Sequence, residues 1–185
     1  ITDADDSHIS GGTVTINTGF TSGDILTLPT QSSGITGTYS TSTGTGVLTL
    51  TNAAPNPIAD YIAALQSITY HTINDNPTTN NTNNSREIIW LVTDADSDVA
   101  GPGTSSPVTS TINITPSTDV PVVSDVGGTL TYIENNPATL IDDTITITDL
   151  DDEELSSATV TISSDFTSGD VLTLVPPSGS GFTPN

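Results

Sequence analysis

One stretch of this 185-residue chain occurs twice, and the repetition constrains the fold more than any other feature of the sequence. Residues 1–28 (ITDADDSHISGGTVTINTGFTSGDILTL) match residues 147–174 (ITDLDDEELSSATVTISSDFTSGDVLTL) without a gap, at a constant offset of 146. Apolar residues and turn residues stay in register together, so we infer an internal duplication. A repeat of this length is too long for a solenoid and typical of one β domain in a tandem array.

The duplication predicts two domains and a boundary between them. Residues 115–123 (TPSTDVPVV) contain two prolines, which stiffen a short extended passage. We predict a first domain at residues 1–118 and the N-terminal part of the next repeat at residues 119–185. The first domain then lacks its first strand, which is equivalent to residues 129–141. We interpret the chain as a section of a longer tandem protein.

Alternation of apolar residues with Thr indicates strands in both domains. Residues 144–148 and 158–162 have the period of half-buried antiparallel strands. Residues 37–53 predict two more around a Gly-Thr-Gly turn. Further strands are expected at residues 67–73, 86–92 and 108–114. The second of these (REIIWLV) is apolar on both faces, as an interior strand requires. The pattern predicts an all-β protein, an antiparallel β-sandwich with Greek-key connections.

One short helix is expected within this β pattern, in NPIADYIAALQ at residues 56–66. Asn56 can cap its start, and Pro57 suits the first helical position. Apolar residues recur at the spacing of one buried helix face. They are Ile58, Tyr61, Ile62 and Leu65. We expect this helix to cross the sandwich.

The charge composition excludes several classes of partner. The chain has 22 acidic residues and a single Lys or Arg, a formal net charge of −21, so it offers no basic surface to nucleic acid or to anionic membranes. It has no Cys for disulfides or thiolate metal sites, and no apolar run approaches the roughly 20 residues of a membrane helix, so we expect no direct membrane insertion. Self-repulsion at this charge opposes compaction unless counter-ions gather where the carboxylates cluster or the medium is rich in salt. Divalent cations are natural candidates for such counter-ions.

Several passages resemble the cadherin-like repeats of very large bacterial surface proteins and adhesins. They are TDVPVV (118–123), YIENNPATLIDDTITITDLDD (132–152), SSATVTISSDFTSGDVLTL (156–174), GITGTYSTSTGTGVLTLT (34–51), IADYIAALQSITYHTINDNPT (58–78) and REIIWLVTDADSD (86–98). The resemblance covers most of the chain. It implies a cadherin- or immunoglobulin-like sandwich that acts as an extracellular spacer, often stiffened by calcium. Where the family usually has Asn-Asp before the Ala-Pro of its junction, this chain has Thr118 and Asp119, so one ligand position is lost.

Acidic clusters at strand ends are candidate calcium ligands. Calcium prefers six to eight hard oxygens, which closely spaced Asp residues on a loop supply. Asp149 and Asp151 lie two residues apart and can point the same way at the end of a strand, whereas Asp152 is expected to face solvent. In a Greek-key sandwich the first two should lie beside Asp119. This arrangement predicts an interdomain calcium cage, which the loop carrying Asp75 would complete.

The remaining acidic residues are expected either to bind calcium at other domain junctions or not to bind it at all. By the same topology Asp94 should approach Asp3 and Asp5, as a half-site that needs a preceding domain, and Glu134 should point to the far junction. The alternative interpretation is that acidic loops are solvated turns, because Asp favours turns for its own backbone hydrogen bonds. For four acids we favour this alternative. They are Asp142, Asp143, Glu153 and Glu154.

The sequence favours a structural function over catalysis. No spacing of Ser, His and Asp suggests a nucleophile, and Trp90 and Tyr70 are expected in the core rather than in a sugar-stacking platform. We hypothesise an extracellular repeat of a cell-surface adhesin or filament, rigidified by calcium, whose partners are neighbouring repeats of the same chain or identical subunits. In a variant of this hypothesis a neighbouring chain donates the missing strand. The alternative is an adhesion module that binds a glycan or a cell surface directly.

Overall fold

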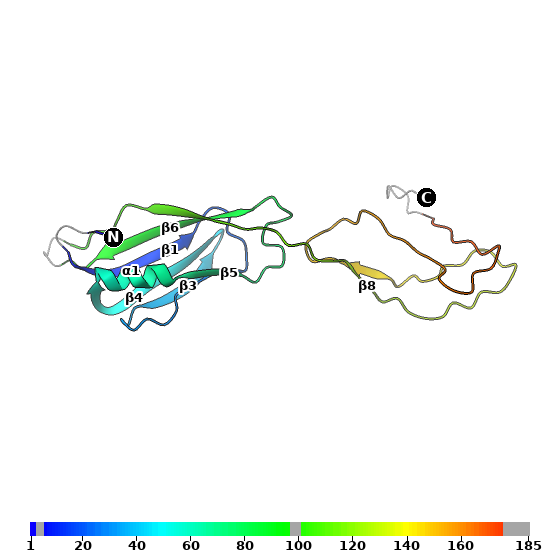
Figure 1. Cartoon of the computed structure of the whole chain (residues 1–185), viewed down its shortest axis with the longest axis horizontal. Coiled ribbons are helices and arrows are strands. Elements are labelled where there is room, and N and C mark those ends of the chain that lie inside the picture. The colour runs from blue at the N-terminus through cyan, green and yellow to red at the C-terminus, as the bar shows by residue number, and fades with distance from the viewer. Residues whose placement is uncertain (3–5, 97–100, 176–185) are drawn as a thin grey trace. The chain divides into compact units, whose positions relative to one another are not determined.

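The computed structural model describes residues 1–2, 6–96 and 101–175, and its regular structure is almost entirely antiparallel β-sheet (Figure 1). In chain order the elements are β1 (His8–Ile16), β2 (Asp24–Thr27), β3 (Thr36–Ser42), β4 (Thr45–Pro57), α1 (Ile58–Ser67), β5 (Thr69–Thr72), β6 (Ser85–Asp94), β7 (Val108–Asn113), β8 (Val122–Ser124) and β9 (Thr146–Thr148). The prediction of an all-β fold with one short helix is confirmed for these residues. The chain forms two compact units, Ile1–Glu153 and Glu154–Asn185. The domain boundary at residues 118/119 stays a prediction.

Five strands of the first compact unit form one sheet in the order β3-β4-β1-β6-β7. β1 is central and pairs antiparallel with β4 and with β6, both of which come much later in the chain. β2 and β5 form a second, two-stranded sheet, and β8 pairs with β9. Segments far apart in the sequence therefore meet in each sheet, as in a β-sandwich, and β6 has the interior position predicted for it.

The core joins residues of both sheets and of the helix. The buried apolar side chains are Ile9, Val14, Ile16, Leu26, Ile35, Leu48, Leu50, Tyr61, Ala64 and Ile88. On β1, Val14 and Ile16 are fully buried, while the neighbouring Thr13 and Thr15 are only half-buried. The alternation in the sequence is therefore the alternation of side chains across the sheet. α1 lies against β1 and β4 and contributes Tyr61 to the core (Figure 1).

The predicted hairpin and helix are present, with corrections at the helix start. β3 and β4 pair along their lengths around a turn at Gly44, whose φ of 77° suits glycine. α1 begins at Ile58, and Pro57 takes the N-cap position without a side-chain cap. The predictions that Asn56 caps the helix and that Pro57 is its first helical residue are therefore both wrong. β4 continues to Pro57, and the Asn56 amide instead donates to the carbonyl of Ser33 at 2.9 Å.

Two strands predicted for the second repeat are absent from the described residues. Residues 129–141 contain a hydrogen-bonded turn instead of a strand, and residues 158–162 form no ladder. A strand needs a neighbour because its backbone N–H and C=O groups must find partners. Val160 is 73% exposed, whereas Val14, its counterpart in the first copy of the repeat, is fully buried. The sequence pattern of a strand is present here, but no strand among the described residues pairs with it.

The chain's single Lys or Arg side chain is buried. Arg86, near the start of β6, has no exposed surface, and its Nε donates to Asp24 Oδ2 at 2.6 Å. Its terminal nitrogens donate to Thr21 Oγ1 at 2.8 Å, Pro77 O at 2.6 Å and Asn83 O at 3.1 Å. A planar guanidinium with five donors can satisfy this many acceptors in a fixed geometry. The ion pair therefore connects β6 of the large sheet to β2 of the small one.

Hydrogen-bond donors surround the Asp24 carboxylate. Besides Arg86, the Thr21 N–H donates to it at 2.8 Å and the Tyr70 hydroxyl at 2.7 Å. Burial by itself raises the pKa of Asp24, but the hydrogen bonds from Arg86, Thr21 and Tyr70 outweigh it, and the pKa is held below its ordinary value of 3.8. Burial, together with the bond to Asp24, raises the pKa of Tyr70. At neutral pH the aspartate is therefore ionised and the tyrosine is protonated.

We expect removal of either partner of this ion pair to destabilise the first compact unit strongly. Asp24→Asn leaves the Arg86 charge buried without a counter-charge, and Arg86→Met leaves the Asp24 charge in the same position. Such losses typically lower the free energy of unfolding by about 3–5 kcal/mol. Urea unfolding of the whole chain, followed by Trp90 fluorescence, measures the difference.

A matched control is available at Asp170, the counterpart of Asp24 in the second copy. Asp170 accepts hydrogen bonds from the N–H and hydroxyl of Thr167, as Asp24 does from Thr21. It is exposed, however, and forms no ion pair within the described residues. Asp170→Asn should therefore lower the free energy of unfolding by less than about 1 kcal/mol. Equal losses at the two positions would contradict the role given to the ion pair.

The lowered pKa of Asp24 also predicts how stability depends on pH. Because the pKa is lower in the folded than in the unfolded state, the contribution is fully present above the ordinary value of 3.8 and is lost as the pH falls through the lower, folded value. We expect the free energy of unfolding of the wild type to fall steeply below about pH 4, and that of Asp24→Asn to fall less. Urea midpoints measured at a series of acidic pH values test this, and parallel curves for the two proteins would count against it.

Candidate metal centre

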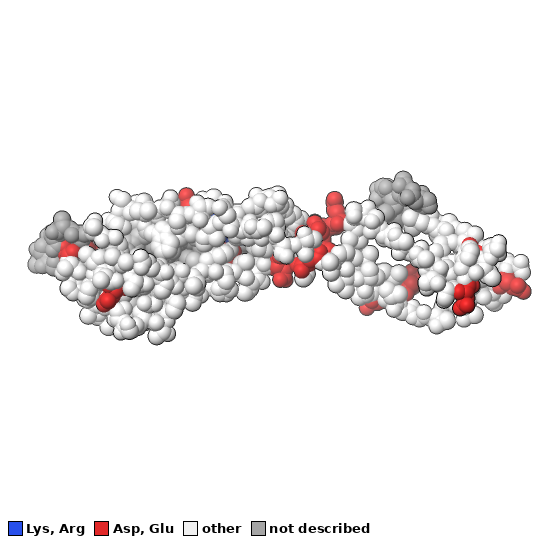
Figure 2. Space-filling view, in the orientation of Figure 1, with Lys and Arg blue, Asp and Glu red and all other residues white. Residues whose placement is uncertain are grey.

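On the face shown in Figure 2, acidic side chains form separate patches among uncharged residues. Among the described residues, one group of three acids can hold a single cation. One oxygen from each of Asp149, Asp151 and Asp152 lies within 4.8 Å of the others. Asp149 and Asp151 are half-buried and Asp152 is exposed. The group contains two of the predicted calcium ligands and one residue that was expected only to face solvent.

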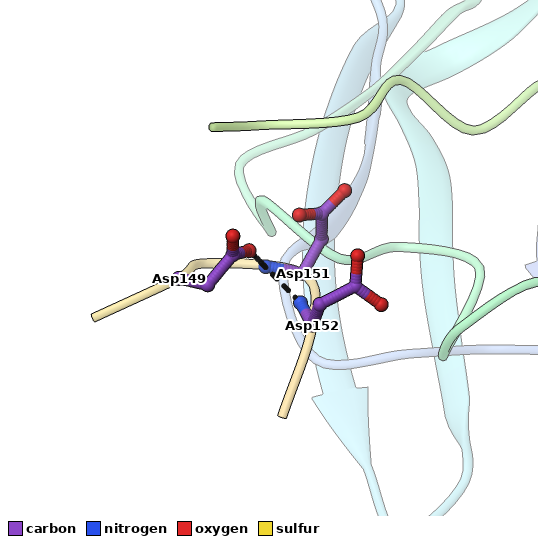
Figure 3. A group of neighbouring side chains, drawn as sticks. All are labelled: Asp149, Asp151 and Asp152. Atoms are coloured by element: carbon purple, nitrogen blue, oxygen red, sulfur yellow. Dashed lines mark hydrogen bonds between the residues drawn. The ribbon is translucent and has the colours of Figure 1, made fainter. Parts of the chain in front are cut away.

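A turn after β9 brings these three residues together. β9 ends at Thr148, and Asp149 Oδ1 then accepts hydrogen bonds from the backbone N–H of Asp151 at 3.1 Å and of Asp152 at 3.0 Å (Figure 3). An Asp side chain commonly folds back in this way onto the residues that follow it. The turn ends the strand and places all three acids on one short loop.

Asp151 joins this loop to two earlier segments of the first compact unit. Its Oδ2 accepts a hydrogen bond from the Asp119 N–H at 3.2 Å, and its carbonyl oxygen accepts one from Asn76 Nδ2 at 3.2 Å. Both segments line a cavity of about 230 Å³, to which Asp75, Asn76, Asp151 and Asp152 contribute. The predicted ligands Asp75 and Asp119 thus lie near the Asp149 loop, and Asp119 reaches it through its main chain.

One carboxylate oxygen in this group has no hydrogen-bond partner. Within the described residues, Asp151 Oδ1 is buried and accepts no hydrogen bond. The neighbouring Asp149 carboxylate raises the pKa of Asp151, because the two groups share a proton more readily than both ionise, and the same contact lowers the pKa of Asp149. A buried carboxylate oxygen beside other carboxylates needs either a proton or a cation.

The donor set fits a hard divalent cation. Calcium takes carboxylate, amide and main-chain oxygens as ligands. Asp149, Asp151 and Asp152 would hold the ion through their carboxylates, and Asp75 and Asn76 offer further oxygens from the loop that lines the same cavity. The group contains no Cys or His, which zinc sites favour. When bound, calcium would supply the positive charge that these acids lack.

The second predicted calcium site is described only in part. Asp3 and Asp5 lie outside the described residues. Asp94 is described, and its Oδ1 accepts hydrogen bonds from the N–H of Asp96 at 3.3 Å and of Gly103 at 2.8 Å. Its carboxylate therefore accepts backbone hydrogen bonds from two residues that follow β6. These bonds are of the kind expected when an acid serves its own turn.

Two other acids lie apart from the group of three. Glu134, a predicted ligand, is exposed in a turn and belongs to no acidic group within the described residues. Asp142 was expected to serve a turn, and its two oxygens accept hydrogen bonds from the N–H of Thr144 at 2.7 Å and of Gly127 at 2.9 Å. The bonds from Thr144, followed by that from Gly127, lower the pKa of Asp142. Asp142 is thus occupied by backbone donors.

The two aromatic residues considered for sugar stacking do not share a surface. Trp90 lines an apolar groove of about 490 Å³ with Leu65 and donates to Ser110 Oγ at 2.8 Å. Tyr70 does not line this groove, and its hydroxyl is bonded to Asp24. Both side chains pack against the core, as predicted.

Sequence reasoning missed Asp152 as a member of the acidic group. It assigned side chains by the alternation of a strand, which sends Asp151 and Asp152 to opposite faces. The strand ends at Thr148, and the turn at Asp149 replaces that alternation. The signal was the Asp149 side chain itself, because an Asp directly after a strand favours a turn.

Comparisons with known proteins identified no relative of this chain. A scan of family models, a search of curated proteins and a search of solved structures each found no match. None of the helices in the described part of the chain is long and apolar enough to span a membrane. The basis for a functional assignment is therefore the chain itself.

Proposed function

We propose that this chain is a structural repeat of an extracellular adhesin or surface filament, and that calcium bound at Asp149, Asp151 and Asp152 makes the junction between repeats rigid. The observation that carries the proposal is the buried Oδ1 of Asp151, which has no hydrogen-bond partner within the described residues. The Asp151 carboxylate also belongs to the group of three acids that can hold one cation. The internal duplication and the resemblance to cadherin-like repeats support the assignment to a tandem surface protein.

The contacts of Asp151 support a structural function for such an ion. Asp151 already connects three segments, namely the loop after β9, the main chain at Asp119 and the loop at Asn76. A cation bound to its free oxygen would fix the passage that follows the β-sandwich to a loop of the sandwich itself. Calcium would then act on the geometry of the junction rather than on the core.

The loop is partly organised for binding before an ion arrives. Asp149 holds the backbone of Asp151 and Asp152 through two hydrogen bonds, so less conformational freedom is lost when the ligands close around a cation. The net charge of −21 raises the local concentration of cations around the protein. At an affinity of roughly 10⁻⁴ M, typical of extracellular modules, calcium about a hundredfold more concentrated would stabilise the folded state by roughly 2.7 kcal/mol.

We expect the chain to bind calcium and the substitution of Asp151 to weaken binding at the Asp149 group. Asp151→Asn removes the charge and keeps the size of the side chain, so the affinity of this site should fall by about tenfold or more, because calcium affinity depends on the number of charged ligands. Isothermal titration of the metal-free chain with calcium chloride measures the affinity.

The matched control for this titration is Asp143→Asn. Asp143 is exposed and lies outside the acidic group, and its substitution changes the net charge by the same amount. The calcium affinity of the Asp143→Asn variant should stay within about twofold of that of the wild type, since a distant exposed charge is screened by solvent and salt. Equal loss of affinity in both variants would assign calcium binding to diffuse charge, and unchanged affinity in Asp151→Asn would exclude this residue.

We further expect chelation to loosen the junction before it unfolds the β-sandwich. None of the core residues belongs to the acidic loop, so circular dichroism should change little when calcium is removed. Small-angle scattering should show a broader distribution of distances within the molecule after chelation, and calcium should reverse the change. Magnesium should restore it poorly, because it requires a tighter octahedral site and keeps its waters. Identical scattering with and without chelator would refute the proposal.

A further inference from the structure

The second copy of the repeat is a potential competitor of the first. Residues 156–174 match residues 10–28, which form most of β1, β2 and the turn between them. Side chains that are buried in the first copy are exposed in the second. Leu26 is 3% exposed and its counterpart Leu172 is 41% exposed. A free segment with nearly the same sequence as two core strands can displace them, in the same chain or in a second copy of it.

The two segments differ at six positions. These are Gly11 and Ser157, Gly12 and Ala158, Asn17 and Ser163, Thr18 and Ser164, Gly19 and Asp165, and Ile25 and Val171. Three of the six replace a glycine by a residue with a Cβ atom. The surroundings of those glycines in the folded first copy determine whether the second copy could occupy the same place.

At Gly19 the structure leaves no space for a Cβ atom. A Cβ built there would lie 2.0 Å from the carbonyl oxygen of Ser85, a backbone atom at the start of β6. The Asn83 side chain holds this approach closed, because its Nδ2 donates to the Gly19 carbonyl at 2.8 Å. Asp165, the counterpart, would bring a Cβ into the Ser85 carbonyl and a carboxylate next to two acceptor oxygens. The second copy therefore cannot take this position without moving β6.

The space for a Cβ atom differs between Gly12 and Gly11. A Cβ at Gly12 would lie 2.9 Å from the Leu91 carbonyl oxygen on β6, closer than real Cβ contacts, so Ala158 does not fit against this strand. A Cβ at Gly11 would lie 3.5 Å from the Leu50 carbonyl oxygen, an ordinary contact, so Ser157 fits. Both close approaches thus face β6, and the tolerated difference faces β4.

We propose that Ala158 and Asp165 are specificity determinants that prevent the second copy from replacing β1 and β2 on β6. Each copy then pairs only with a strand whose backbone leaves room for its own residues. Neighbouring repeats of similar sequence are prone to exchange strands and to misassemble. Ala158 and Asp165, which stand where the first copy has glycine, oppose such exchange. The apolar residues that build the core are kept in both copies. This specificity acts during folding and does not depend on calcium.

The direct test restores the glycines in the second copy. The double variant Ala158→Gly, Asp165→Gly should form strand-exchanged dimers when the whole chain is refolded from urea at high protein concentration. Size-exclusion chromatography with light scattering should then show a dimer fraction that rises with concentration and exceeds that of the wild type. Ser157→Gly is the matched control, because Gly11 tolerates a Cβ, and it should behave as the wild type does. A double variant with no more dimer than the control would overturn the proposal.

A second test places the residues of the second copy in the first. Gly12→Ala and Gly19→Asp should each lower the midpoint of thermal unfolding by about 5 °C or more, a large effect for a domain of this size. Gly11→Ser and Ile25→Val, which make equivalent exchanges without the close contact, should shift it by less than about 2 °C. If Gly19→Asp fails to fold at all, the result supports the proposal, because the variant is expected to be destabilised. Midpoints of Gly12→Ala and Gly19→Asp equal to those of the two controls would overturn the proposal.

Discussion

Arg86 and Asp24 meet at 2.6 Å in the interior of a chain that has no other Lys or Arg and 22 acidic residues. A charge is costly to bury unless it is paired and hydrogen-bonded, and here both conditions are met by groups from β6, β2, β5 and the loops beside them. The apolar core alone is modest, and it is non-directional. The ion pair adds a fixed geometry, because it requires the two sheets to lie where the guanidinium and the carboxylate meet.

Arg86 of this ion pair also holds the loop that contacts the candidate metal centre. Arg86 donates to the carbonyl oxygens of Pro77 and Asn83, two residues of the loop between β5 and β6. Three residues within that loop have positive φ, a conformation that costs free energy and needs support from its surroundings. They are Thr79, Asn80 and Asn81. Asn76, directly before Pro77, donates to the carbonyl of Asp151. A buried charge in the sandwich is thus connected through one loop to the acidic group after β9.

Local patterns predicted most of the first compact unit, because its strands alternate in sequence and find partners within the chain. The hairpin around Gly44 and the helix at Ile58 follow from residues close together in the sequence. The pair of Arg86 and Asp24 does not, since the two residues lie on strands of different sheets and no periodic pattern relates them. Their signal was compositional: a lone base at the start of an apolar strand needs a buried acid. In the second repeat the pattern was a poor guide, because alternation shows which face a strand would bury and not whether a neighbouring strand is present.

The burial of Arg86 also determines where a protease can act. Trypsin cuts after Lys and Arg, so the chain offers it one peptide bond, between Arg86 and Glu87, on an interior strand between β1 and β7. A protease needs an extended, accessible segment, which this bond becomes only when the large sheet opens. The rate of trypsin cleavage therefore measures how often the large sheet opens. It does not depend on the conformation of the acidic loops, which contain no Lys or Arg. An intact sandwich of this kind is therefore expected to resist cleavage by trypsin-like enzymes at this bond.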